Sequence, residues 1–167
     1  MNIFVLSENI KECAQMYVDK HVVKMILEHC QMLSTSYNLS GGVGPYKPTH
    51  VNHPCSVWVR SSLENWKWLF DLTKELDIER QFRFGSNKEH KSLSKIKDHL
   101  SQFGYPSITS GILTPFAQAM PMYCRDKDAV TAYRKYYRME KQHLYSWSHR
   151  SVPEFIFEDD SFLYERS

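Results

Sequence analysis

The chain lacks the features that mark several large classes of protein. Its 167 residues include only six glycines and four cysteines, and the absence of CxxC spacing argues against a zinc ribbon or a disulfide scaffold. Lysine and arginine number 21 against 19 acidic residues, so no bulk charge attracts a polyanion. The apolar run at 3–6 is too short for a signal peptide or a membrane span. We therefore expect a cytoplasmic protein, in the host cytoplasm if a phage encodes it, with reduced and mostly buried thiols and no membrane contact.

Apolar residues are plentiful, at 42% hydrophobic and 14% aromatic, and many recur at helical spacing. We predict an all-α fold: a single compact multi-helix domain over 1–167 that opens with a short extended arm at 3–6. The predicted helices cover 8–18, 21–37, 54–76, 90–100 and about 126–147, with irregular segments at 38–53 and 105–123. The predicted caps are Ser7, Asp19, Ser86 with Glu89, and Asp126 or Asp128. The acidic, aromatic tail 153–167 either packs on this domain or frays.

The segment DKHVVKMILEHCQML, residues 19–33, carries polar side chains along one side of an otherwise apolar helix. His21, Lys24, Glu28 and Gln31 recur every three or four residues and therefore form one stripe. Apolar residues cover most of the remaining circumference, which is more than a helix on the outside of a protein needs. The stripe either lines a cleft or contains a solvated Lys24–Glu28 pair of the common i, i+4 kind.

A second polar cluster, HVNHPCSVWVR, precedes and opens the helix that starts at Pro54. His50, Asn52 and His53 lie at its mouth, where free N–H groups and the helix dipole favour an anion such as phosphate. Arg60 follows within the helix and is expected near the same site. His53 alone is also explained as a helix cap. A metal site is disfavoured because no cysteine or carboxylate follows at ligand spacing.

A third cluster lies in YRKYYRMEKQHLYSWSHR, residues 133–150. Arg134 and Arg138 alternate there with tyrosines, and cations among aromatic rings suit a nucleic-acid backbone with bases available for stacking. An amphipathic helix that buries its tyrosines and solvates its charges gives the same pattern. Both interpretations remain open at this point.

The blocks DKHVVKMILEHCQML and NHPCSVWVR, in this order, resemble the pyrimidine dimer DNA glycosylase family typified by phage endonuclease V, above all its uncharacterised phage and bacterial members. The likeness covers roughly residues 1–76, with weaker support from AMP at 119–121 and the tyrosine-rich segment beyond. The family implies an all-helical DNA-repair enzyme, a glycosylase and AP lyase, that acts on duplex DNA without metal or other cofactor. Its free amine attacks C1′ of the damaged nucleotide to form a Schiff base, and an acidic residue assists base loss and strand cleavage.

Two amines are candidates for this nucleophile. The characterised members use the α-amine exposed after removal of the initiator methionine, but Asn2 is too large for efficient removal, so Met1 should persist. The position nearest the family's acid holds Lys24, and Glu28 is the only carboxylate of the stripe. In peptides an α-amine titrates near ~8 and a lysine near ~10.4, so a lysine needs burial to react at neutral pH. We therefore expect Met1 or Lys24 as nucleophile and Glu28 as acid or base.

The remaining residues of the three clusters are expected to bind substrate. They are His21, Gln31, His50, Asn52, His53, Arg60, Arg134 and Arg138. The alternative is a non-catalytic protein that binds a nucleotide or nucleic acid, such as a phage factor that captures a host signalling nucleotide. A third possibility is an interaction module whose stripe pairs with a partner helix.

Overall fold

The computed structural model describes residues 1–161, and helices form all of the regular structure in this part of the chain. The α-helices are α1 (Ile10–Met16), α2 (Asp19–Asn38), α3 (Pro54–Ser61), α4 (Leu63–Phe84), α5 (Lys91–Phe103) and α6 (Ala129–Glu140). Short 3-10 helices cover Met122–Cys124, Gln142–Leu144 and Glu154–Phe157. The all-α prediction is confirmed, and the segment 105–121 is irregular as expected.

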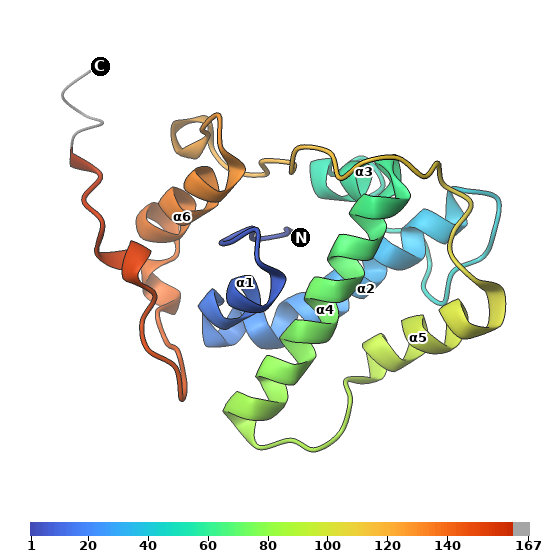
Figure 1. The fold of residues 1–167 in the computed structure, drawn as a ribbon, viewed down its shortest axis with the longest axis horizontal. Helices are drawn as coiled ribbons and strands as arrows, with labels where there is room; N and C mark the ends of the chain where they lie inside the picture. Colours follow the sequence, from blue (N-terminus) through green and yellow to red (C-terminus); the bar gives the residue numbers. More distant parts are fainter. Residues whose placement is uncertain (162–167) are drawn as a thin grey trace.

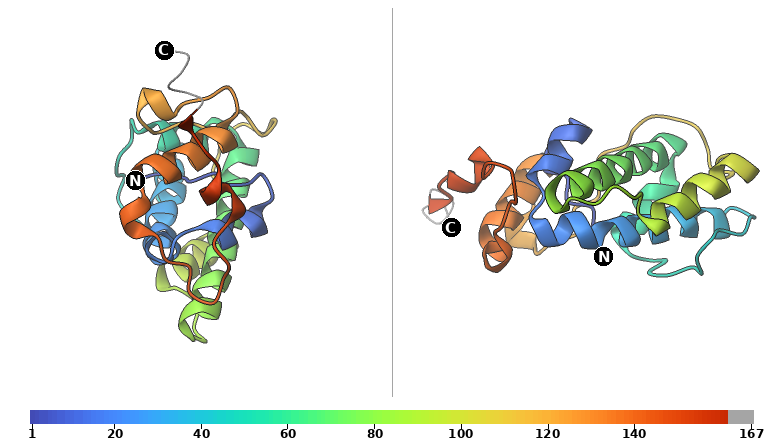
Figure 2. Two further views of the ribbon diagram at one scale, coloured as in Figure 1. Left: turned by 90° about the vertical axis from the view of Figure 1, so that its left-hand side faces the viewer. Right: turned by 90° about the horizontal axis from the view of Figure 1, so that it is seen from below.

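The two longest helices, α2 and α4, pack against each other at the centre of the molecule (Figure 1). Helix α1 packs on α4, α3 packs on both long helices, and α5 packs mainly on α2. Figure 2 shows an elongated molecule with α6 and the C-terminal segment at one end and α5 near the other. The long irregular segment after α5 connects these two ends (Figure 1).

The N-terminal arm, residues 1–6, runs into the middle of the molecule (Figure 1). Its apolar residues 3–6 are each at most 4% exposed. The Phe4 N–H donates a hydrogen bond to Oη of Tyr17 at 3.0 Å, and Nε of Arg134 donates to the Leu6 carbonyl at 2.8 Å. The predicted extended arm is therefore confirmed, and side chains from distant parts of the chain fix its backbone.

Several helix boundaries differ from those predicted. The predicted helix 54–76 is two helices, because Ser62 has an extended backbone and its Oγ accepts the Asn65 N–H at 3.1 Å while donating to the Ile112 carbonyl at 2.9 Å. Helix α4 then continues to Phe84. The last helix ends at Glu140 instead of about 147.

The helix caps also differ in part from the prediction. Asn9, and not Ser7, caps α1: its side chain accepts the Glu12 N–H at 3.0 Å, whereas Ser7 accepts the N–H of Asn9 just before the helix. At the start of α5 this role belongs to His90, and the predicted capping box of Ser86 and Glu89 is wrong. The cap of α6 is Asp128, one of the two residues predicted.

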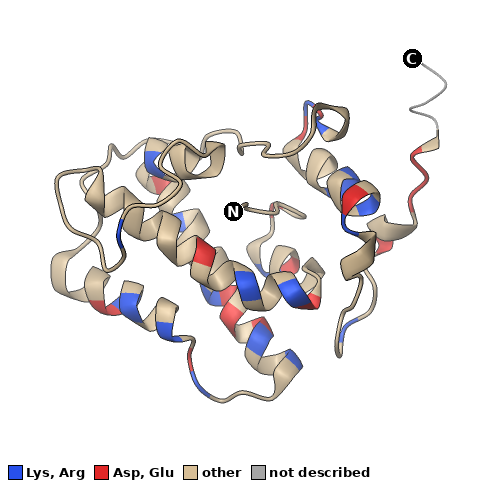
Figure 3. Cartoon of the chain, turned by 180° about the vertical axis from the view of Figure 1, so that it is seen from behind, with Lys and Arg blue, Asp and Glu red and all other residues tan. Residues whose placement is uncertain are grey.

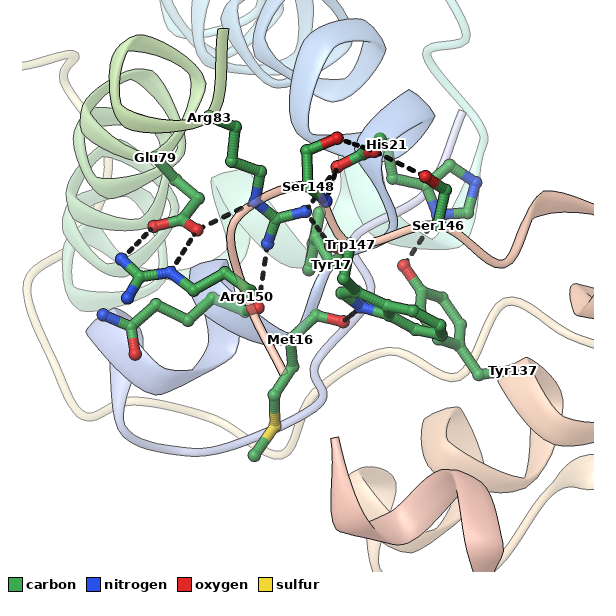
Figure 4. A network of polar contacts seen from close by, with 12 residues as sticks. Met16, Tyr17, His21, Glu79, Arg83, Tyr137, Ser146, Trp147, Ser148 and Arg150 are labelled. Atoms are coloured by element: carbon green, nitrogen blue, oxygen red, sulfur yellow. Dashed lines mark hydrogen bonds and ion pairs between the residues drawn. The ribbon is translucent and has the colours of Figure 1, made fainter. Parts of the chain in front are cut away.

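Arg83 lies at the centre of a buried ionic network that joins α1, α2 and α4 (Figure 4). Its side chain is fully buried. It donates to the carboxylates of Glu79 at 2.8 Å and Asp19 at 3.0 Å, and to the carbonyls of Tyr17 at 2.7 Å and Gln15 at 2.8 Å. A buried guanidinium requires hydrogen-bond acceptors for its N–H groups and carboxylates for its charge, since an unpaired charge in the interior is costly.

The same two carboxylates hold the chain that follows α6 (Figure 4). Asp19 was predicted to cap the second helix, but it accepts hydrogen bonds from the hydroxyls of Ser146 and Ser148, each at 2.7 Å. Arg150 donates to both oxygens of Glu79, at 2.8 and 3.0 Å. Burial alone would raise the pKa of each carboxyl, but these hydrogen bonds outweigh it and lower the pKa of Asp19 and of Glu79.

The structure also tests two expectations drawn from composition, the state of the cysteines and the lack of a membrane span. All four cysteines are buried and none is in a disulfide, as predicted; they are Cys13, Cys30, Cys55 and Cys124. Within residues 1–161, no helix combines the length and the apolar character needed to cross a membrane.

Two buried histidines beneath the arm make the stability of the fold sensitive to acid. Burial lowers the pKa of His29 to about 3, although the backbone of Asn2 acts in the opposite direction. Burial also lowers the pKa of His21 to about 3, and nearby cations, Lys141 first among them, act in the same direction. Both imidazoles are therefore neutral in the folded protein near neutral pH.

We expect the free energy of unfolding to fall by about 2 kcal/mol for each of these histidines between about pH 7.5 and pH 5. The sign follows from the lowered pKa: the stabilisation is complete above the unfolded value of 6.5 and is lost as the pH falls below it. Urea denaturation at the two pH values measures the effect. His29→Gln should remove about 2 kcal/mol of the pH dependence, and the exposed control His50→Gln should remove none. Equal stability of the wild type at both pH values would contradict the prediction.

Candidate active site

The polar stripe of α2 meets the start of the chain at Glu28. The α-amine of Met1 lies 3.5 Å from Oε2 of Glu28, and Nζ of Lys24 lies 3.6 Å from Oε1. The Glu28 side chain is 16% exposed, whereas the Lys24 side chain is 71% exposed. Lys24 therefore lacks the burial that a lysine needs to react at neutral pH, and the amine anchored by a buried side chain is that of Met1.

Glu28 is only partly satisfied by this arrangement. Its Oε2 atom is buried and accepts no hydrogen bond from any residue that the structure describes. Buried carboxylate oxygens almost always have a hydrogen-bond donor, because desolvation of an unpaired charge is costly. The ammonium at 3.5 Å balances the charge, but it is too distant for a strong hydrogen bond. This oxygen therefore keeps an unused acceptor position close to the α-amine of Met1.

The side chain of Met1 acts as an anchor for the amine. It is 2% exposed, and the hydroxyl of the buried Ser56 approaches its sulfur at 3.7 Å. Because the side chain packs inward, the α-amine of Met1 has a restricted position beside Glu28. This restriction is the property that a reactive amine in a preorganised site requires.

His53 borders the pair formed by Met1 and Glu28. Its Nδ1 accepts the Cys55 N–H at 3.1 Å, which confirms the alternative interpretation of His53 as a helix cap. Burial lowers the pKa of His53, and the positive charge of the Met1 amine acts in the same direction, while the Glu28 carboxylate opposes them. Ser56, which contacts the Met1 side chain, follows three residues later in α3, so His53 caps the end of α3 that lies nearest to the candidate site.

The other residues of the second cluster, which precede α3 or lie within it, differ in exposure and in hydrogen bonding. His50 is exposed and has φ +47°, with its Nδ1 2.8 Å from the hydroxyl of Thr49. Asn52 is also exposed. Arg60 is half-buried and donates to the Val51 carbonyl at 2.7 Å, so it fixes the turn before α3 and makes no contact with Glu28.

His21 is not available to a substrate, contrary to the expectation from the stripe. It is 6% exposed, its ring stacks on Phe4 at a centroid distance of 4.2 Å, and its Nδ1 lies 2.7 Å from Oη of Tyr137. The stripe turns inward at this end because the arm covers α2. At the other end Gln31 is half-buried, on the same side of α2 as Lys24.

The predicted substrate-binding arginines of the third cluster are also engaged within the protein. Arg134 donates to the Leu6 carbonyl, and Arg138 pairs with Asp160 and Glu158 of the tail at 2.7 and 3.2 Å. The tyrosines at 133 and 137 are fully buried, which supports the amphipathic-helix interpretation of this segment. The tail therefore packs on α6 through residue 160, and 162–167 lie outside the described residues.

Exposed residues of α2 extend the candidate site across the surface. Lys20 and Lys24 form one exposed row, and Val23 and Leu27, 46% and 40% exposed, form a parallel apolar row. Elsewhere cationic and acidic residues are interspersed, for example along α4 and α5 (Figure 3). Local placement, and not overall charge, thus determines what this face can bind.

Comparison with known proteins returned no match to any family model, curated protein or solved structure.

Proposed function

We propose that the protein is a DNA-repair enzyme of the pyrimidine dimer glycosylase and AP lyase kind, with the α-amine of Met1 as nucleophile. The observation that carries the proposal is the 3.5 Å approach of this amine to the incompletely satisfied Oε2 of Glu28. Schiff-base chemistry on a sugar requires a primary amine and an acid–base group within reach of each other. The pair supplies both, and the reaction requires neither metal nor cofactor.

The reaction proceeds through an imine. The neutral amine attacks C1′, and the glycosidic bond breaks as the base leaves with the bonding electrons and takes up a proton. The nitrogen loses a proton to Glu28, and Glu28 passes this proton to the ring oxygen as the sugar ring opens to the protonated imine, which restores the carboxylate. Removal of a C2′ proton by the carboxylate then expels the 3′ phosphate, which cleaves the strand. Water hydrolyses the imine and restores the amine.

The α-amine of Met1 is held more firmly beside Glu28 than the amine of Lys24, which favours Met1 as the nucleophile. The Met1 amine is held by a buried side chain, whereas Lys24 is exposed and must lose conformational freedom before it reacts. Lys24 and Lys20 instead suit contact with the phosphates of a duplex bound over α2, and the apolar row of Val23 and Leu27 suits contact with unstacked bases.

Borohydride trapping tests the proposal, because it reduces the imine to a stable amine. We expect a covalent protein–DNA adduct with a duplex that contains one abasic site or one pyrimidine dimer, and none with the undamaged duplex. A protein carrying a Gly-Ser extension ahead of Met1 should give no adduct, since its amine is displaced from Glu28. Absence of an adduct with both damaged duplexes would reject the proposal.

One separate feature favours nucleotide binding as a second candidate function. A hollow of about 350 Å³ is lined by the aromatic side chains of Tyr37, His99, Phe103 and Tyr105. It adjoins a polar hollow of about 430 Å³ that contains Arg60, and the two share Ser40 and Ser107. Aromatic rings beside an arginine suit a base and a phosphate. Tight calorimetric binding of a mononucleotide, together with no trapped adduct, would favour this alternative.

A further inference from the structure

The side-chain amide of Asn2 fastens the start of the chain to distant segments. Its Nδ2 donates to the carbonyl of Ala119 at 2.7 Å. Its Oδ1 accepts the Ile3 N–H at 2.8 Å, lies 3.0 Å from Oη of Tyr133 in α6, and is approached by Sγ of Cys55 in α3 at 3.5 Å. The residue is 8% exposed. Asn2 is thus a buried polar residue whose hydrogen-bonding capacity is used within the protein.

Tyr133 completes this arrangement from the opposite side. It is fully buried, and burial raises its pKa well above the ordinary value, so the hydroxyl keeps its proton. That proton is shared between the Ala117 carbonyl at 2.6 Å and Oδ1 of Asn2 at 3.0 Å, and the oxygen accepts the Ala119 N–H at 3.3 Å. The segment 117–119, residue 2 and α6 therefore meet at one hydroxyl.

We infer that Asn2 and Tyr133 are positioning residues that hold the α-amine of Met1 at Glu28. The inference rests on the proposed function. Consecutive Cα atoms are about 3.8 Å apart, so fixing residue 2 leaves the amine only the rotations of Met1 itself. The buried Met1 side chain restricts those rotations in turn. Asn2 is too large to allow the removal of Met1 that the characterised members of the resembled family undergo. Its contacts explain why a large amide side chain stands at this position.

Asn2→Leu tests the inference because leucine has a similar size but lacks the amide. A large second residue also keeps Met1 in place, which intact mass spectrometry verifies. We expect the single-turnover rate of adduct formation with an abasic duplex to fall by about 10- to 100-fold at saturating DNA, since a displacement near 1 Å has an effect of this size. The DNA concentration for half-maximal rate should not change, because neither residue faces the solvent.

Tyr133→Phe provides a milder second variant. It should slow adduct formation less than Asn2→Leu, and the double variant should be no slower than Asn2→Leu alone, because the two residues act through one contact. Tyr137→Phe is the matched control: Tyr137 is equally buried on α6, but its hydroxyl bonds to His21 and not to Asn2. This control should lower thermal stability and leave the rate of adduct formation unchanged.

Two outcomes would overturn the inference: an unchanged saturated rate in Asn2→Leu with Met1 retained, or an equal loss of rate in Tyr137→Phe. If the wild type forms no adduct at all, the proposed function fails and a second measurement tests the positioning role. The rate of acylation of the Met1 α-amine by an activated acetate ester, followed by peptide mass spectrometry, should then rise several-fold in Asn2→Leu. An unchanged acylation rate would refute the positioning role.

Discussion

Glu28→Gln is expected to lower the rate of trapped-adduct formation on an abasic duplex by about 10²- to 10⁴-fold, the usual range for loss of a general acid–base group. The amide has the shape of the carboxylate but cannot accept the amine proton or remove a proton from C2′. The substitution breaks no hydrogen bond at Oε2 from the described residues, but it removes the ion pairs of Glu28 with the Met1 amine and with Lys24, so thermal unfolding of the variant is measured alongside. Single-turnover trapping at saturating DNA measures the effect.

Two further variants make this result specific. Glu75→Gln, at a half-buried carboxylate of α4, should leave the rate of adduct formation unchanged. Lys24→Gln removes the exposed neighbour of Glu28 and should weaken duplex binding without preventing adduct formation. Full activity of Glu28→Gln, or complete loss of the adduct in Lys24→Gln, would contradict the assignment of Met1 and Glu28.

Arg83→Met is expected to lower the free energy of unfolding by about 3–5 kcal/mol, the usual cost of breaking a buried ion pair from one side. Methionine fills much of the same volume but leaves the carbonyls of Gln15 and Tyr17 without a donor. The carboxylates of Asp19 and Glu79 keep only their contacts with the chain after α6. Urea denaturation at neutral pH measures the loss.

The matched control for this prediction is Lys74→Met, also on α4. Lys74 forms an ion pair with Asp71 in which both side chains are largely exposed, at 40% and 50%, so its loss should cost less than about 1 kcal/mol. A loss below about 1 kcal/mol in Arg83→Met as well would mean that the buried network of Figure 4 contributes little to stability.

Helical periodicity predicted which parts of the chain are helical, but local signals did not fix where each helix ends. Ser62 interrupts the predicted helix 54–76 because its hydroxyl bonds to the carbonyl of Ile112, some fifty residues later. Asp19 looks like a cap in sequence, but Ser146, Ser148 and Arg83 compete for its carboxylate in the fold. Contacts across such sequence separations are not visible in a local pattern.

Spacing predicted that Glu28 and Lys24 lie together, whereas the amine of Met1 entered the prediction only through the family resemblance. Spacing on α2 placed Lys24 and Glu28 on one stripe, and their contact is observed. Spacing could not show that the arm covers the His21 end of the stripe, because burial there depends on the packing of Phe4. The role inferred for Asn2 was missed, although AMP at 119–121, which contains its partner Ala119, was part of the family resemblance.

The most direct test of the central claim is to locate the atom of the protein that becomes bonded to DNA. The borohydride-reduced adduct with an abasic duplex is digested with nuclease and protease, and the modified peptide is sequenced by mass spectrometry. The account predicts that the sugar remnant is attached to the α-nitrogen of Met1. Attachment to Nζ of Lys24, or the absence of any modified peptide, would contradict it.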